Sequence, residues 1–389
     1  MTSNKFNAGF HDHLSYYIAN QISPVHQNLK NLQNHLDRRS FLYDSLGITK
    51  LLIKNSRIFE FGPGSGHNSL YVSKLNSKNY FLFEPNPTGY KEIKNLYKKY
   101  KNIKSPKVFN NTLQDYSKKI HGCADIVICE SWIGSLDSEL KLINKFINML
   151  NSNGILVLTF QPAIGMLPNM LRRIIGYSIT EGSDNFSIKT LKLTNFFKKE
   201  LKSISRMTRP YEDWVQDTLL SPSALTSVIS LDSILKSLNN KFNILNTYPK
   251  YFKIYDWYKN FIGKKRNIDP IYLNELFKNY YNFLDMNHTY QADENILKSK
   301  KVDKLIYNLF YLMFNLEKKN THLKEINRIK NILTKISYET KNLKTKKIIK
   351  DCLVILNSDN KYKKYYSENN SLLGLFGREL CYVSLQKKR

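Results

Sequence analysis

The chain contains little cysteine. Its four cysteines, Cys123, Cys129, Cys352 and Cys381, are scattered over 389 residues. They form no C-x-x-C pair and no cluster with histidine at zinc-ligand spacing, so the sequence supports neither a disulfide framework nor a structural metal site. Unpaired cysteines of this kind are typical of a reducing compartment, and no metal is expected.

Long apolar runs are missing as well. No uninterrupted stretch reaches the roughly 18 residues needed to span a bilayer. The first residues, Met1-Thr2-Ser3-Asn4-Lys5-Phe6, lack the apolar core of a signal peptide. We therefore expect a cytoplasmic protein without a transmembrane segment, long enough for one elaborated domain or two.

Acidic residues are scarce relative to basic ones. The chain has 60 Lys and Arg against 32 Asp and Glu, which gives a formal charge of +28 and a pI near 9.7. This charge is compatible with nucleic acid, with peripheral contact on an anionic surface, or with an acidic glycan. Lys, Asn and Ile also abound where they look purely structural, as happens when base composition drives residue choice. Charge alone therefore does not identify a partner.

The strongest functional signal is a glycine-rich stretch. Residues 58–66 read Ile-Phe-Glu-Phe-Gly-Pro-Gly-Ser-Gly, which predicts a buried strand that ends in a turn, with a helix opening after it. Glycine permits backbone angles forbidden to other residues and lets a ligand approach the bare main chain. Three glycines at alternate positions, Gly62, Gly64 and Gly66, therefore indicate a cofactor turn.

Around this turn, short apolar runs alternate with amphipathic helices, which is the pattern of a parallel sheet covered on both faces. We predict strands at 57–61, 80–83, 107–109, 126–129 and 155–160, and helices near 68–77, 88–100, 113–119 and 137–150. The sequence therefore predicts an α/β, Rossmann-like fold. Asn153-Gly154 supplies the turn before the fifth strand.

The rest of the chain is predicted to add helices and further strands. Residues 8–50 show helical spacing, interrupted at Pro24, and 168–175 form a short basic amphipathic helix. Ile329, Leu333, Ile336 and Leu343 follow a heptad-like spacing that favours a packed helical pair. We divide the chain into an N-terminal helical lid (1–55), a cofactor-binding core (56–162), a substrate-binding insertion (163–240), a return strand (241–258), a basic helical block (259–373) and a final strand with its tail (374–389).

The glycine spacing separates two classes of cofactor. A dinucleotide turn needs G-x-G-x-x-G, and its third glycine would fall at position 67, which holds the bulky His67. Instead, Glu60 and the three glycines give Glu-x-Gly-x-Gly-x-Gly, which resembles motif I of the class I S-adenosylmethionine-dependent methyltransferases. The resemblance covers residues 57–162. The segments 130–136, 162–173, 209–214 and 377–378 further resemble a bacterial branch of that superfamily whose members mostly lack an assigned substrate.

The resemblance implies a cofactor, S-adenosylmethionine, and residues that hold it. In this superfamily the turn passes under the methionine part, and the acidic residue before it, here Glu60, orients the ammonium group. Glu84, which ends the second strand, would accept the ribose hydroxyls, although a solvated loop glutamate is the alternative. The superfamily usually places a polar side chain and a backbone amide after the third strand against adenine. Asn111 is the residue expected there, with a plain turn asparagine as the alternative, and Leu113 is also expected to contact the cofactor. His67 is expected to touch the cofactor backbone.

The resemblance also implies a fold and a catalytic edge. Residues 380–385 would be the seventh strand, antiparallel between the fifth and the sixth, in a mainly parallel sheet with helices on both faces. Glu130, at the end of the fourth strand, would face the reactive methyl and either steer the sulfonium or take a proton. His13 is a second candidate base from the lid, although a solvated helix face also explains it. No Asn/Asp-Pro-Pro-Tyr/Phe element follows the fourth strand, which disfavours adenine and glutamine amines as acceptors.

The acceptor is expected to contact the insertion. Trp132, after the fourth strand, and Arg209, Tyr211, Glu212 and Trp214 are the candidate substrate-binding residues; an Arg209–Glu212 ion pair is the alternative. We therefore expect methyl transfer to an O or N atom of a small or carrier-linked acceptor such as a sugar, glycan or secondary metabolite. An RNA methyltransferase that uses the basic C-terminal helices, and a non-catalytic scaffold that retains the fold, are the alternatives.

Overall fold

The computed structural model describes residues 12–23, 26–113, 122–131, 133, 137–204, 207–226, 228–252, 255, 257–263, 269–318 and 322–388. These residues form two compact units. The sheet unit comprises residues up to 160, 229–276 and those from 380 onward, and the helical unit comprises 161–228 and 277–379. The helical unit is therefore built from two segments that are separate in the sequence.

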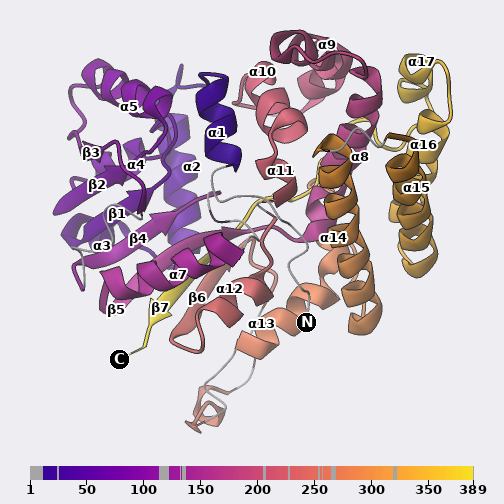
Figure 1. The fold of residues 1–389 in the computed structure, drawn as a ribbon. Helices are drawn as coiled ribbons and strands as arrows, with labels where there is room; N and C mark the ends of the chain where they lie inside the picture. The colour runs from indigo at the N-terminus through magenta and orange to yellow at the C-terminus, as the bar shows by residue number, and fades with distance from the viewer. Residues whose placement is uncertain are drawn as a thin grey trace. The chain divides into compact units, whose positions relative to one another are not determined.

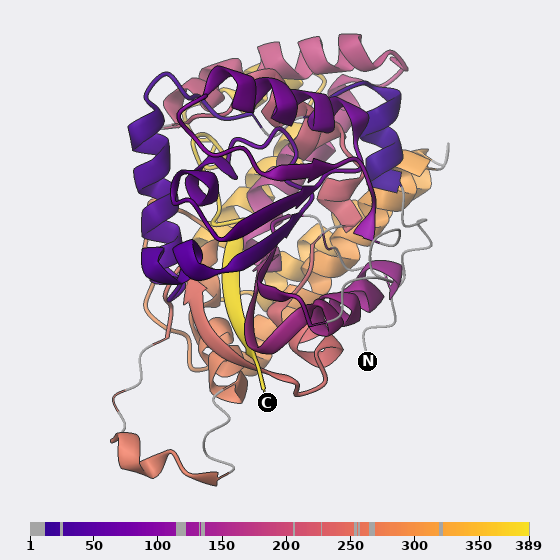
Figure 2. The same cartoon turned by 90° about the vertical axis from the view of Figure 1, so that its left-hand side faces the viewer.

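The sheet unit contains a seven-stranded sheet in the order β3-β2-β1-β4-β5-β7-β6 (Figure 1). Its strands are β1 (Arg57–Phe61), β2 (Asn79–Phe83), β3 (Lys107–Phe109), β4 (Ala124–Cys129), β5 (Leu150–Phe160), β6 (Phe242–Tyr248) and β7 (Cys381–Lys387). β1 to β5 pair in parallel, whereas β7 is antiparallel to both β5 and β6. Figure 2 shows β7, in yellow, beside β6. The predicted α/β fold and the place of the seventh strand are confirmed.

The fifth strand starts earlier than expected. β5 begins at Leu150 and continues through Asn153, whose φ is +63°, with a register shift against β4. Asn tolerates this left-handed angle, so the Asn153-Gly154 turn signal marks an irregularity inside a strand and not its start.

Alternate residues of β1 face two different layers, as the two-residue period of a strand requires. Ile58 belongs to a buried cluster that includes Val72 and Ile93 of the helices on one face. Phe61, on the other face, stacks on Phe83 with ring centroids 4.6 Å apart and packs on Phe146 at 5.2 Å. Glu60 shares the face of Ile58, so its carboxylate lies in an otherwise apolar layer.

Helices of the sheet unit cover these faces. They are α4 (Leu70–Lys74), α5 (Pro87–Lys99), α7 (Asp137–Met149), α12 (Leu231–Ser237) and α13 (Asp269–Lys278). The same unit contains a short 3-10 helix, η3 (Tyr258–Asn260), which has no buried residue. Three helices precede the sheet, namely α1 (Asp12–Ala19), α2 (Leu32–Ser45) and α3 (Lys50–Asn55). The helix predicted at 113–119 lies outside the described residues except for Leu113. Coil separates α1 from α2 over a longer stretch than Pro24 alone predicted, and this coil contacts the glycine turn, as shown below.

The described residues of the helical unit are mainly helical. The helices are α8 (Ala163–Ile179), α9 (Phe186–Ser203), α10 (Tyr211–Trp214), the π-helix η2 (Val215–Leu220), α11 (Ser223–Thr226), the 3-10 helix η5 (Tyr280–Phe283), α14 (Ile296–Lys318), α15 (His322–Glu339), α16 (Leu343–Leu356) and α17 (Lys361–Tyr365). The predicted packed pair corresponds to α15 and α16, but Leu343 is 79% exposed. The reason is that α15 ends at Glu339, so the heptad spacing does not continue into α16.

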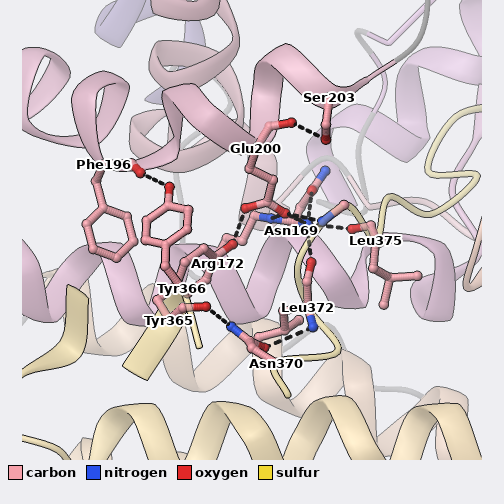
Figure 3. Close-up of polar contacts among 11 residues, drawn as sticks. Asn169, Arg172, Phe196, Glu200, Ser203, Tyr365, Tyr366, Asn370, Leu372 and Leu375 are labelled. Carbon is pink, nitrogen blue, oxygen red and sulfur yellow. Dashed lines mark hydrogen bonds and ion pairs between the residues drawn. The ribbon is translucent and has the colours of Figure 1, made fainter. Parts of the chain in front are cut away.

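The prediction of a short basic amphipathic helix at 168–175 is wrong. α8 runs from Ala163 to Ile179, and the side chains of Arg172 and Arg173 are 0% and 1% exposed. Arg172 forms an ion pair with Glu200 of α9 and donates to the Leu372 carbonyl at 3.0 Å (Figure 3). Arg173 donates to Glu317 of α14 through Nε at 2.7 Å. Both guanidinium groups therefore crosslink the interior of the helical unit and present no basic face.

Replacing Arg172 by Met should lower the free energy of unfolding by about 3–5 kcal/mol, because Glu200 would keep a buried charge without its counter-charge. The matched control is Lys236→Met, which removes a cation from an ion pair with Asp232 whose side chains are 75% and 41% exposed. That pair should contribute less than about 0.5 kcal/mol. Urea denaturation followed by circular dichroism measures both variants. Equal losses in the two variants would contradict a stabilising role for the buried pair.

Candidate functional site

The glycine turn leaves β1 at its carboxyl end. Gly62, Gly64 and Gly66 have φ values of +68°, +59° and +77°, a region that other residues rarely adopt. A Cβ added at Gly66 would lie 2.9 Å from Cγ1 of Ile93 in α5. The sequence therefore needs glycine here for two reasons, the backbone angles and the close packing of α5 against the turn.

Glu84 joins the end of β2 to this turn. Its Oε2 accepts a hydrogen bond from the main-chain N–H of Gly64 at 2.7 Å, and its Oε1 accepts one from the N–H of Asn86 at 2.8 Å. Because Phe61 pairs with Phe83 in the parallel register of β1 and β2, the two chain segments leave the sheet side by side. Burial raises the pKa of Glu84 to about 7, although both backbone hydrogen bonds oppose the shift.

Glu60 lies one strand residue before the turn and is 4% exposed. The Tyr80 hydroxyl of β2 donates a hydrogen bond to its Oε2. Burial raises the pKa of Glu60 to about 7, and the charge of Glu130 raises it further, against the opposing effect of the Tyr80 hydrogen bond. The turn is thus flanked by two buried carboxyl groups on adjacent strands.

Glu130 directly follows β4, which is the other neighbour of β1 in the sheet. Its carboxylate contacts two side chains of α2. Arg39 of α2 contacts it through two hydrogen bonds, from Nη2 to Oε1 at 2.5 Å and from Nη1 to Oε2 at 3.1 Å. The Tyr43 hydroxyl donates to Oε1 at 3.4 Å. The side chains of Arg39 and Glu130 are only 8% and 11% exposed. Arg39 and Tyr43 carry no signal of this role in the sequence, because their spacing is that of an ordinary amphipathic helix and only the fold brings them to β4.

Three histidines lie around the turn. Nδ1 of His67 accepts a hydrogen bond from the N–H of Gln27 at 2.7 Å, and Nε2 of His35 is 3.0 Å from the His67 carbonyl. Burial lowers the pKa of His35 to about 4, so it is a neutral donor to that carbonyl. His26 packs edge-to-face on His67. The coil between α1 and α2 is therefore tied directly to the glycine turn.

The two residues predicted to lie near adenine differ in exposure. Asn111 is exposed and Leu113 is buried at 1%. The neighbouring Asn110 donates through Nδ2 to the carbonyl of Glu84 at 2.8 Å, which ties β3 to the end of β2. From the sequence the two adjacent asparagines could not be told apart, and the roles predicted for Asn111 and Leu113 stay predictions.

The predicted substrate residues lie in the helical unit or outside the described chain. The ion pair that the structure shows for Arg209 is with Asp217, at 2.5 Å. Trp214 is 5% exposed and packs edge-to-face on Phe376, with ring centroids 6.2 Å apart. Tyr211 is half-buried and Glu212 is exposed. The substrate-binding roles of these four residues stay predictions.

Two further site predictions fall where the structure is not described. Trp132 is outside the described residues, and His13 lies in α1 with its side chain outside them.

Within the described part of the chain, no group of three or more His, Cys, Asp or Glu side chains is arranged to hold a metal ion. Over the same residues, no helix is long and apolar enough to cross a membrane.

Comparison with known proteins gives structural similarity only. No family model matches the sequence, and no curated protein matches it. The chain is 11% identical to the YcgJ protein of Bacillus subtilis, with a TM-score of 0.37, over 89% of this chain and 99% of that one. It is 22% identical to the tRNA (m1A58) methyltransferase TrmI from Aquifex aeolicus, with a TM-score of 0.25, over 30% of this chain and 46% of that one. It is 21% identical to the precorrin-6y C5,15-methyltransferase from Geobacter metallireducens, with a TM-score of 0.26, over 32% of this chain and 61% of that one.

Because these TM-scores are low, the fold is assigned from the sheet itself. The seven strands form one continuous sheet, in which β1 to β5 are parallel and β7 lies antiparallel between β5 and β6. The glycine turn follows the first strand. Insertions after β5 and after α13 leave this order unchanged. The chain has the fold of the class I S-adenosylmethionine-dependent methyltransferases.

Proposed function

We propose that the protein is an S-adenosylmethionine-dependent methyltransferase. The observation that carries the proposal is the pair of buried carboxyl groups, Glu60 and Glu84, on the adjacent strands that flank the glycine turn. In parallel α/β sheets, ligands bind at the carboxyl ends of the strands. The glycine turn, Glu84 and Glu130 all lie at this edge, because β2, β1 and β4 are neighbours in the sheet.

The residues at this edge fit a cationic cofactor. Glu60 is buried and the side chain of Glu130 is 11% exposed, and Arg39 supplies one guanidinium against these two carboxyl groups. One carboxylate is therefore left to balance a positive ligand group such as an ammonium, which suits Glu60. Each carboxylate oxygen has two lone pairs. The N–H groups of Gly64 and Asn86 each use one lone pair, on different oxygens of Glu84. Glu84 can therefore still accept hydrogen bonds from two ribose hydroxyls.

When bound, the cofactor supplies a methyl group on a positively charged sulfur. Transfer is an in-line displacement, so the protein contributes mainly by holding the acceptor atom in line with that methyl group. The Arg39 guanidinium engages both oxygens of Glu130, so its carboxylate is poorly placed to take a proton. We therefore assign Glu130 an electrostatic and orienting role at the carboxyl end of β4. His13 remains the candidate base.

The acceptor that best suits this proposal is a small or carrier-linked molecule that receives the methyl on an O or N atom. The segment 209–214, with its arginine, tyrosine, tryptophan and carboxylates, offers hydrogen bonds and aromatic surface for a polar, ring-containing acceptor such as a sugar. The N-terminal helices are proposed to act as a lid over the cofactor.

Replacing Glu84 by Ala should weaken S-adenosylmethionine binding by about 100-fold or more, because two hydrogen bonds to a charged group, each worth about 1.5–3 kcal/mol, are lost. Isothermal titration calorimetry on the purified chain measures the affinity. The matched control is Glu368→Ala, which removes an exposed carboxylate of the helical unit and should leave the affinity unchanged. Absence of any binding by the folded wild-type protein would overturn the assignment.

Cofactor binding should strengthen as pH rises from 6 to 8. Glu60 and Glu84 have pKa values of about 7 in the cofactor-free protein, so below that pH they carry protons that a cationic ligand must displace. The affinity should fall by up to about tenfold per pH unit for each group below its pKa. At pH 7 the observed enthalpy should vary with the ionisation enthalpy of the buffer, and less so in Glu60→Gln. An affinity independent of pH over this range would refute the coupling.

Replacing Arg39 by Gln should lower the free energy of unfolding by about 3–5 kcal/mol, because Glu130 would be left buried beside Glu60 without its counter-charge. The double variant Arg39→Gln/Glu130→Gln should recover at least half of the loss and still bind the cofactor, since Glu60 and Glu84 remain. Denaturant unfolding and calorimetry measure the two quantities. If the two substitutions have additive effects, Arg39 and Glu130 are not coupled.

A further inference from the structure

One short turn of the sheet unit exposes an unusual concentration of large apolar side chains. Tyr255, Trp257, Tyr258 and Ile262 are 87%, 61%, 73% and 72% exposed. Among the described residues, 16 large hydrophobic side chains are exposed, and these four fall within eight positions. The other twelve are distributed over the remainder of the described chain. Clustered apolar side chains in water mark a contact surface more often than scattered ones do.

Backbone hydrogen bonds lie within this aromatic turn, defined as Tyr255 and 257–262. Hydrogen bonds run from Asn260 N–H to the Trp257 carbonyl at 2.9 Å and from Phe261 N–H to the Tyr258 carbonyl at 3.1 Å. The rings of Trp257 and Tyr258 pack edge-to-face with an interplanar angle of 83°. Nζ of Lys259 lies 4.8 Å from the centroid of the Trp257 ring. The turn therefore presents apolar groups and a cation together.

The sequence around the turn is strongly basic. Between Lys250 and Arg266 there are six Lys or Arg residues and a single acidic residue, Asp256. A negatively charged partner is therefore favoured. The partner must also contain an apolar region in which Ile262 and the aromatic rings can be buried. Anionic bilayers combine both properties, since Trp and Tyr settle at the headgroup level and basic side chains meet lipid phosphates.

We propose that the aromatic turn docks the protein on an anionic lipid bilayer. Single-stranded RNA is the less suitable partner, because bases stack on open aromatic faces. Here Lys259 covers one face of Trp257, Tyr258 stands at nearly a right angle to it, and Ile262 offers no stacking surface. Docking would place the sheet unit, with its cofactor edge, at a membrane surface. The docking requires no cofactor, so its test is independent of the methyltransferase assignment.

The test is co-sedimentation of the full chain with vesicles of phosphatidylcholine alone or with about 30% phosphatidylglycerol. The wild-type protein should bind only the anionic vesicles, with its tryptophan emission shifted to the blue, and binding should weaken as salt rises. Trp257→Ala/Tyr258→Ala should lower the apparent affinity by about tenfold or more. Trp257→Phe should remove the fluorescence shift while largely keeping the binding.

The matched control is Tyr338→Ala, which removes a tyrosine of α15 that is 84% exposed and should not change vesicle binding. Equal losses in this control and in the double variant would overturn the proposal, because the binding would then not be localised. Two other outcomes would also overturn it. One is a dimer, measured by light scattering, that Trp257→Ala/Tyr258→Ala dissociates. The other is binding to single-stranded RNA that the same variant abolishes while anionic vesicles do not bind the wild type.

Discussion

The hydrogen bond from the Gly64 N–H to the Glu84 carboxylate is the contact on which the arrangement at the carboxyl ends of β1 and β2 depends. It closes the gap between the ends of two parallel strands whose register places Phe61 opposite Phe83. The turn can reach Glu84 only because its glycines adopt positive φ angles, and α5 can pack beneath it only because Gly66 has no side chain. The same carboxylate orders the next segment through Asn86. A single side chain thus organises the turn, the end of β2 and the start of α5.

This arrangement is electrostatically demanding. Removing a carboxylate from water disfavours its charged form, and Glu60, Glu84 and Glu130 are all largely buried at one sheet edge. One guanidinium, from Arg39, partly offsets this, and backbone donors and the Tyr80 hydroxyl stabilise the other two groups. Holding Glu60 and Glu84 at raised pKa destabilises the folded chain at pH values above the ordinary pKa of a carboxyl group, because deprotonation is easier in the unfolded chain. The proposed cationic ligand would offset this cost by favouring the charged form of Glu60.

The helical unit shows that net charge is a poor guide to basic surface. Arg172 and Arg173 count toward the +28 charge of the chain, yet both are fully enclosed and satisfied by carboxylates and carbonyl oxygens. The two segments 161–228 and 277–379 meet around them in one compact unit. What distinguishes the aromatic turn is therefore not charge alone, but charge combined with exposed rings on a hydrogen-bonded backbone.

The sequence by itself determined the parallel strands, the glycine turn and the acidic residues that flank it. These features are local, because continuous apolar runs specify buried strands and only glycine satisfies the turn. The tertiary structure decided that Arg39 and Tyr43 meet Glu130, that Asn110 is the asparagine tied to Glu84, and that Arg172 and Arg173 are interior. Helical spacing reports which face of a helix is buried, not which distant residue it will face. Arg39 and Glu130 are 91 positions apart, and only the packing of α2 against the sheet brings their charges together.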